Sequence, residues 1–210
     1  RGYRPQANAA PIKETLAAAL CDLARLRPYH TLYDPMCGSG TILIEGAMMV
    51  HNIAPGVNRY FSAERWDVID ERVWADERNR ARDLVNYDTD FIAYGSDIDE
   101  DALEIAKINA KRAGVERKIK FEKADIRNFE PKSEKGTVIC NPPYGERLLD
   151  IEEAQKLYKI MGEKFIKKHG WAYYVISPSE EFEKEFGRKA DKRRKLYNGM
   201  IKCQLFMYFK

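Results

Sequence analysis

The chain has 210 residues, of which 44% are hydrophobic, so it can bury one sizeable core, and its length favours a single α/β domain over two. Lys and Arg total 36 against 33 Asp and Glu, and this net charge of +3 is far from the strongly basic balance of a dedicated nucleic-acid-binding domain. No run approaches the roughly 18 apolar residues of a membrane span, and the first residues lack the apolar core of a signal peptide. We therefore expect a cytoplasmic protein. Its four cysteines, which show no C-x-x-C spacing, argue against a zinc site.

Predicted strands and helices alternate along the chain. The strands are expected at residues 31–34, 91–97, 119–125, 136–140 and 171–176, and the helices at 11–27, 42–49, 99–113, 152–168 and 182–186. Such alternation implies parallel crossovers and a doubly wound sheet. Residues 54–90 are highly charged and are expected to form an irregular surface insertion with a polar helix at 77–85. Asn198-Gly199 predicts a terminal hairpin, which makes the last strand antiparallel.

The motif Asn141-Pro142-Pro143-Tyr144 follows the apolar strand at 136–140 and is the first candidate for chemistry. Two consecutive prolines end a strand abruptly, because proline fixes φ and has no N–H to donate. The carbonyls of Asn141 and Pro142 can then accept hydrogen bonds from another group. With the Asn141 amide on one side and the flat ring of Tyr144 on the other, this strand end suits a planar group that bears an amine, such as a nucleobase.

A glycine-bearing loop leads from the first predicted strand into the next helix. It reads Asp34-Pro35-Met36-Cys37-Gly38-Ser39-Gly40-Thr41, and its glycines allow the backbone to pass close under a ligand whose carboxylate meets the helix N-terminus. No Gly-Lys-Ser/Thr follows, so the loop is not a Walker A motif. Leu43 stands where a dinucleotide fingerprint needs its third glycine, which disfavours NAD.

Two further acids are expected at strand ends on the same edge of the sheet, where open α/β folds bind their ligands. Asp97 can accept hydrogen bonds from both hydroxyls of a ribose, or it can cap the next helix. Asp125 can accept from an adenine amine while Ile98 and Ile126 enclose the ring, or it can be a turn residue.

Together these segments resemble class I S-adenosylmethionine-dependent methyltransferases that act on exocyclic amino groups. More narrowly, they resemble bacterial guanine-N2 methyltransferases of large-subunit ribosomal RNA, which are often labelled as N6-adenine-specific DNA methylases. The matching stretches are Arg1-Gly2-Tyr3-Arg4, residues 10–17, residues 34–41 and Asn141-Pro142-Pro143-Tyr144-Gly145-Glu146-Arg147. The resemblance implies a seven-stranded, mostly parallel Rossmann-like sheet with an antiparallel C-terminal hairpin strand and helices on both faces. It also implies a THUMP-containing N-terminal RNA-binding region, which we expect to be absent from this chain.

The predicted reaction is methyl transfer from S-adenosylmethionine, which leaves S-adenosylhomocysteine, to an exocyclic amine, with no metal. Asn141 and Pro142 would hold the amine hydrogens, and Tyr144 would stack on the base. The motif itself is also compatible with adenine N6 in DNA and with glutamine N5 in protein. A third reading is a cofactor-binding module that is inactive without its N-terminal region.

A basic run precedes the hairpin and supplies the candidate contacts to RNA phosphates. Six of its eight residues are cationic, and the other reading of such a run is a solvated loop; the six are Arg188, Lys189, Lys192, Arg193, Arg194 and Lys195.

Overall fold

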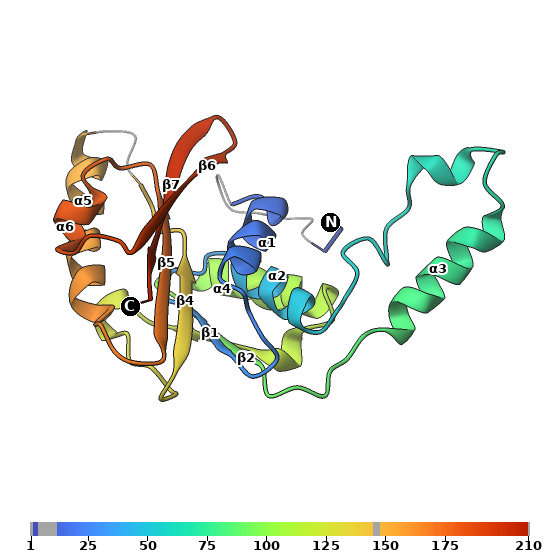
Figure 1. Cartoon of the computed structure of the whole chain (residues 1–210), viewed down its shortest axis with the longest axis horizontal. Helices are drawn as coiled ribbons and strands as arrows, with labels where there is room; N and C mark the ends of the chain where they lie inside the picture. Colours follow the sequence, from blue (N-terminus) through green and yellow to red (C-terminus); the bar gives the residue numbers. More distant parts are fainter. Residues whose placement is uncertain (1, 4–11, 145–147, 210) are drawn as a thin grey trace.

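A computed structural model of the chain describes residues 2–3, 12–144 and 148–209. Its centre is a seven-stranded sheet in the order β3-β2-β1-β4-β5-β7-β6 (Figure 1). Five strands are parallel, whereas β7 lies antiparallel between β5 and β6. The strands are β1 (Thr31–Asp34), β2 (Ile92–Asp97), β3 (Ile119–Lys123), β4 (Gly136–Cys140), β5 (Trp171–Ser177), β6 (Lys192–Asn198) and β7 (Ile201–Tyr208). The predicted sheet, including its antiparallel C-terminal strand, is confirmed.

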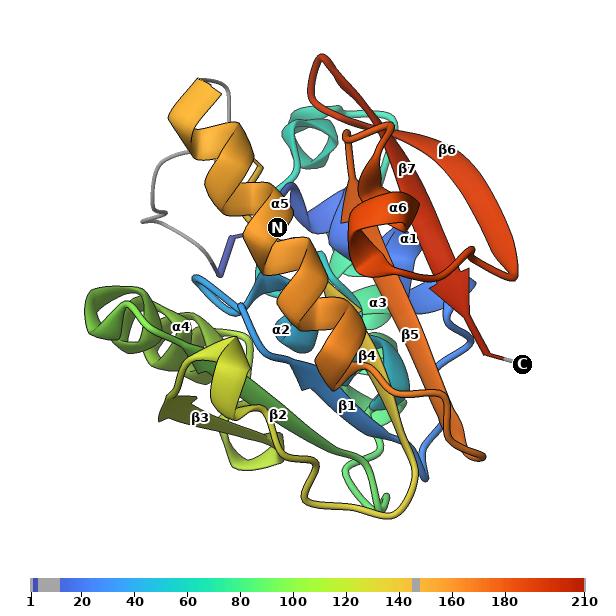
Figure 2. The ribbon, with the colours of Figure 1, turned by 90° about the vertical axis from the view of Figure 1, so that its left-hand side faces the viewer.

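Helices cover both faces of this sheet, and each face has its own apolar core (Figure 2). One core joins the sheet to α1 (Glu14–Leu23), α2 (Thr41–Val50) and α4 (Glu100–Arg112). The other joins it to α5 (Leu148–Lys164) and α6 (Phe182–Phe186). Strand β4 lies between the two cores and is buried along its whole length, which explains its unbroken apolar sequence.

The order of strands places a topological switch point between β1 and β4. Strand β1 pairs with β2 on one side and with β4 on the other, so the crossovers leave β1 in opposite directions. In a doubly wound sheet the carboxyl ends of the strands at this point border a crevice. Helix α4 begins there because the Asp99 side chain accepts hydrogen bonds from the backbone N–H groups of Asp101 at 3.0 Å and Ala102 at 3.3 Å.

The C-terminal hairpin differs from the prediction in its extent. Strand β6 begins at Lys192, so four residues of the basic run belong to a strand and not to a solvated loop. The turn is formed by Gly199 and Met200, one residue later than expected, because Asn198 still pairs with Ile201. Gly199 has φ +63°, the left-handed conformation that a tight hairpin turn requires.

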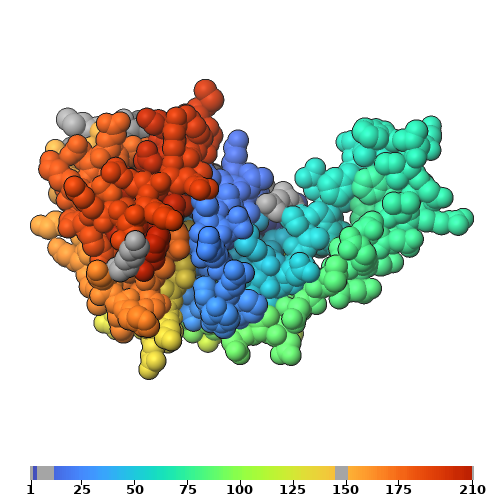
Figure 3. All heavy atoms as spheres, in the orientation of Figure 1, coloured from blue at the N-terminus to red at the C-terminus, as the bar shows by residue number. Residues whose placement is uncertain are grey.

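Residues 54–90 project from the body of the molecule (Figure 3). Their main element is α3 (Glu71–Asp83), which begins six residues earlier than the predicted polar helix and has no buried residue. Trp74 stacks on Phe61 with ring centroids 6.0 Å apart, and this contact ties α3 to the segment before it. Among the described residues, no helix is both long enough and apolar enough to cross a membrane.

Candidate active site at the carboxyl edge

A cleft of about 1010 Å³ lies at the carboxyl ends of β1, β2, β3 and β4. It brings together segments that the sequence places more than 100 residues apart. Most of the predicted site residues line it: Asp34, Pro35, Cys37, Gly38, Ser39, Thr41, Asp97, Ile98, Asp125, Ile126, Asn141, Pro143 and Tyr144. Pro142 is buried and does not line the cleft, and neither does Gly40, where a Cβ would lie 3.1 Å from Ala106.

Backbone hydrogen bonds fix the conformation of the glycine-bearing loop. The backbone N–H of Cys37 donates to the Ser96 carbonyl at 3.0 Å, and the N–H of Gly40 donates to the Cys37 carbonyl at 2.8 Å. Gly38 has φ +51°, and a Cβ at that position would meet nothing within 4 Å. Gly38 therefore borders free space in the cleft, as expected for a loop that passes under a ligand.

Asp97 fixes this loop to the end of β2. One carboxylate oxygen accepts the backbone N–H of Gly38 at 2.8 Å, and the other accepts that of Asp99 at 3.0 Å. The sequence predicted only a ribose-binding or a capping role for Asp97, and the structure adds a structural one. A carboxylate oxygen has two lone pairs, so both oxygens of Asp97 retain acceptor capacity for ribose hydroxyls.

Asp34 is the most deeply buried acid of the cleft, with 2% of its surface exposed. Burial, with the charge of Asp97 nearby, raises its pKa well above the usual value for a carboxyl group, although a 3.3 Å hydrogen bond from the Met36 N–H opposes the shift. A buried carboxylate of this kind is stabilised by a cation. S-adenosylmethionine offers two cationic groups, its ammonium and its sulfonium, so Asp34 fits this cofactor.

Asp125 is paired more tightly than the sequence indicates. Its carboxylate accepts hydrogen bonds from the Arg127 backbone N–H at 2.8 Å and from the guanidinium at 2.6 and 2.9 Å, and the hydrogen bonds from Arg127 lower its pKa to about 2. Ile126 is buried and Ile98 is 67% exposed, yet both line the cleft. They offer the two apolar surfaces that were predicted to enclose an adenine.

Asn141 follows the end of β4. It lines the cleft on the side opposite to Ile98, which follows β2, and Ile126, which follows β3. Its side-chain oxygen Oδ1 is buried and has no hydrogen-bond partner among the described residues. A buried acceptor without a donor costs about 1–3 kcal/mol. The Tyr144 hydroxyl accepts a hydrogen bond from Asn198 Nδ2 at 2.7 Å, which links the motif to the β6–β7 hairpin.

Other cleft residues were not predicted from the sequence. Ile12 comes from the segment before α1, and Arg127 is the partner of Asp125; Lys156, Leu157 and Ile160 come from one face of α5. Their helical spacing is that of any amphipathic helix, so no sequence signal marks the α5 face as part of the site. The motif residues Arg1, Arg4, 10–11, Gly145, Glu146 and Arg147 lie outside the described residues.

The doubly wound sheet with its antiparallel β7, the glycine-bearing loop after β1 and the Asn-Pro-Pro-Tyr motif after β4 define a class I S-adenosylmethionine-dependent methyltransferase domain. Comparison with known proteins narrows this class. The family model described as the RMKL-like methyltransferase domain matches residues 1–206, and the chain belongs to this family.

Two curated relatives and one solved structure illustrate the match. YpsC of Bacillus subtilis (strain 168) is 44% identical over 209 residues, which are 100% of this chain and 54% of that protein. The ribosomal RNA large subunit methyltransferase K/L of Shewanella sp. (strain W3-18-1) is 41% identical over 99% of this chain and 30% of its own. The solved structure of SMU.472 in complex with SAH has a TM-score of 0.91 and 43% identity, covering 99% of this chain and 54% of that one. The chain thus spans about half the length of YpsC and of SMU.472, and about a third of the length of the Shewanella relative.

Proposed function

We propose that this domain transfers the methyl group of S-adenosylmethionine to the exocyclic N2 amine of guanine in large-subunit ribosomal RNA. The observation that carries the proposal is the buried, unpartnered Oδ1 of Asn141 at the wall of the cofactor cleft. An exocyclic amine supplies the N–H donor that this oxygen lacks. The name of the Shewanella relative supports ribosomal RNA as the acceptor, and the resemblance of the motifs supports guanine.

The cofactor supplies an electrophilic methyl group on a positively charged sulfur. Asn141 Oδ1 and the Pro142 carbonyl each accept one hydrogen of the amine, so that the nitrogen lone pair points toward the methyl group. In the transfer that the cofactor would supply, the amine nitrogen would take the methyl group from the sulfur, S-adenosylhomocysteine would leave, and the nitrogen would lose one proton to solvent. Because the chemistry needs no strong base before transfer, orientation by Asn141 and stacking by Tyr144 supply the catalysis.

The cofactor would be held by the loop and the strand ends. The helix α2 N-terminus behind residues 38–40 would hold the carboxylate of the methionine part, and Asp34 would stabilise its cationic groups. Asp97 would accept the ribose hydroxyls, and Ile98 and Ile126 would enclose the adenine. The six residues of the basic run, from Arg188 to Lys195, would contact phosphates of the RNA.

The test is transfer of labelled methyl from S-adenosylmethionine to total RNA, DNA and protein from cells that lack the corresponding enzyme, followed by nucleoside and amino-acid analysis. We expect label as N2-methylguanosine in large-subunit ribosomal RNA. Label as N6-methyladenine in DNA or as N5-methylglutamine would contradict the proposal. If no fraction is labelled although S-adenosylhomocysteine stabilises the chain, the domain is a cofactor-binding module that lacks activity by itself.

A further inference from the structure

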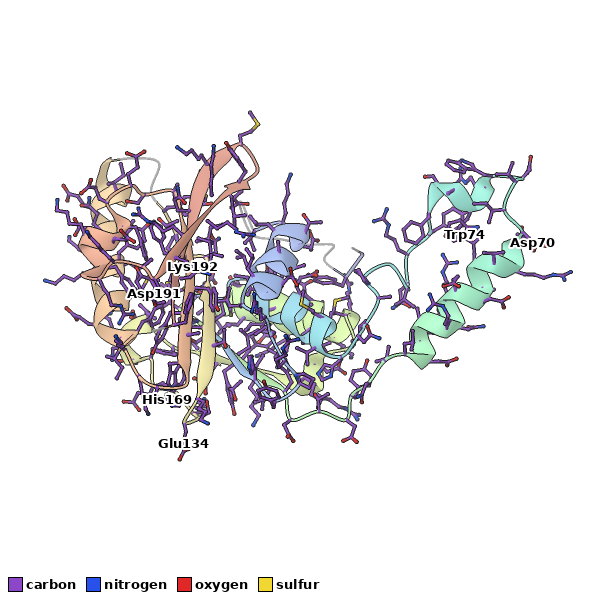
Figure 4. All side chains as sticks on the ribbon, in the orientation of Figure 1. Asp70, Trp74, Glu134, His169, Asp191 and Lys192 are labelled. Atoms are coloured by element: carbon purple, nitrogen blue, oxygen red, sulfur yellow. The ribbon has the colours of Figure 1, made fainter. Side chains whose placement is uncertain are left out.

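A second hollow lies at the opposite edge of the sheet from the cofactor cleft. It has a volume of about 1030 Å³ and is bordered by the first residues of three strands, Thr31 of β1, Gly136 of β4 and Trp171 of β5, and by the last residue of β7, Tyr208. We call it the amino-edge groove. Figure 4 shows His169, one of its lining residues, at this end of the sheet, with Asp191 and Lys192 above it.

The amino-edge groove is strongly cationic. One acid, Asp191, is among its lining residues, and its Oδ2 accepts the Phe209 N–H at 2.7 Å. Five cations face it, and none of them forms an ion pair with a described residue; they are Lys135, Lys167, Lys168, Arg188 and Lys189. Uncompensated cations gathered in one groove attract a polyanion.

Two buried nitrogens in the groove also lack partners. Arg188 is fixed by a hydrogen bond from Nη2 to the Phe165 carbonyl at 3.0 Å and by stacking over the Tyr208 ring at 4.7 Å. Its Nε is nevertheless buried without a hydrogen-bond partner, and so is Nδ1 of His30. Both atoms have almost no solvent-accessible surface, so a phosphate oxygen does not reach them, and Arg188 contributes its fixed positive charge to the groove.

Strand β6 connects this groove with the active site. It begins at Lys192, next to the groove, and ends at Asn198, whose side chain donates to Tyr144 of the catalytic motif. It is an edge strand about 20 Å long at ~3.3 Å per residue, and its first four residues are exposed cations. Charge on an edge strand also prevents pairing with other chains, but that role requires no cations in the groove.

We propose that the amino-edge groove binds the phosphate backbone of a single RNA strand, which then follows β6 to the catalytic motif. The inference rests on the proposed function, because it takes the methyl acceptor to be RNA. It adds three lysines that the basic run does not contain, Lys135, Lys167 and Lys168, and places the anchoring contacts at the far edge of the sheet from the target base.

The test measures binding of a fluorescent single-stranded RNA to the full chain as a function of salt concentration. Lys167→Ala/Lys168→Ala removes two exposed cations from the groove, and Lys111→Ala/Arg112→Ala removes two exposed, unpaired cations from the end of α4 as a matched control. Each phosphate contact with a single strand contributes about 0.7 to the slope of log affinity against log salt. We expect the groove variant to lower this slope by about 1.4 and the control to leave it unchanged.

Equal effects of the two variants, or no effect of the groove variant, would overturn the groove proposal. Complete displacement of RNA by equimolar tripolyphosphate would also overturn it, because the site would then be one for small anions. Stabilisation by S-adenosylhomocysteine shows that each variant is folded. If the groove variant weakens RNA binding while RNA accepts no methyl group, the proposed function fails and the groove stands. If RNA is methylated and the groove variant binds RNA normally, the groove proposal fails and the proposed function stands.

Discussion

Replacing Asn141 by alanine should make the protein more stable and less active. In most proteins the loss of a partly buried polar side chain is destabilising, because its partners are left unsatisfied. Here Asn141 Oδ1 is buried and has no hydrogen-bond partner among the described residues, so the folded chain already bears its desolvation cost. Asn141→Ala removes that cost.

The size of the effect follows from the exposure of the side chain. An unsatisfied buried acceptor costs about 1–3 kcal/mol, and the lower end applies because Asn141 as a whole is only partly buried. A gain of about 1 kcal/mol raises Tm by about 2–4 °C in a domain of this size. Thermal unfolding without cofactor, followed by circular dichroism, measures this shift.

Asn109→Ala is the matched control. Asn109 is 1% exposed, and its Nδ2 donates to the Ser39 carbonyl at 3.2 Å, so the same substitution should lower the free energy of unfolding by about 1–2 kcal/mol. If both variants lower Tm alike, Asn141 has a structural partner in solution, and the reasoning that assigns its oxygen to a substrate amine is refuted.

Three further predictions concern the cofactor, the fold and the target base. The raised pKa of Asp34 means that the folded chain holds a proton that the unfolded chain releases near pH 4, so the free energy of unfolding should fall as pH rises from there to the folded pKa. Asp34→Asn should abolish this loss in pH-dependent thermal unfolding and weaken S-adenosylmethionine binding at neutral pH. Gly162→Ala should destabilise the chain by about 3 kcal/mol in urea unfolding, because the new Cβ would clash with the Phe186 carbonyl oxygen. Wild-type stability of this variant would contradict the packing of α5 on α6. Tyr144→Phe loses the hydrogen bond from Asn198 but keeps the ring, so RNA affinity in binding titrations should change little, whereas Tyr144→Ala should weaken RNA binding by about 1–3 kcal/mol. Equal losses of RNA affinity in the two variants would exclude stacking.

The fold could be predicted largely because the sheet is parallel and buried. A strand such as β4, enclosed between two cores, must be apolar throughout, and the residues that follow it must be polar or turn-forming. Since the carboxyl ends of parallel strands meet at one edge, the segments after β1, β2 and β4 were expected to converge, and the cleft contains them.

What the sequence could not show depends on contacts between distant residues. The hydrogen bond from Gly38 to Asp97 joins positions 59 residues apart, and nothing in either segment signals it. Only the start of strand β6 was missed, because an edge strand exposed along its first four residues has no apolar alternation, so its cations resemble those of a loop. The amino-edge groove is likewise assembled from the starts of several strands.

The role of Asn141 is tested by methyl transfer with the Asn141→Ala variant at saturating S-adenosylmethionine, with S-adenosylhomocysteine affinity measured on the same preparation. Loss of one preorganised hydrogen bond at the reacting group costs about 10²–10³ in rate. We therefore predict at least a 100-fold lower rate of guanine methylation, with cofactor affinity close to that of the wild type. A variant that methylates at the normal rate would contradict the assignment of Asn141 as the residue that holds the amine.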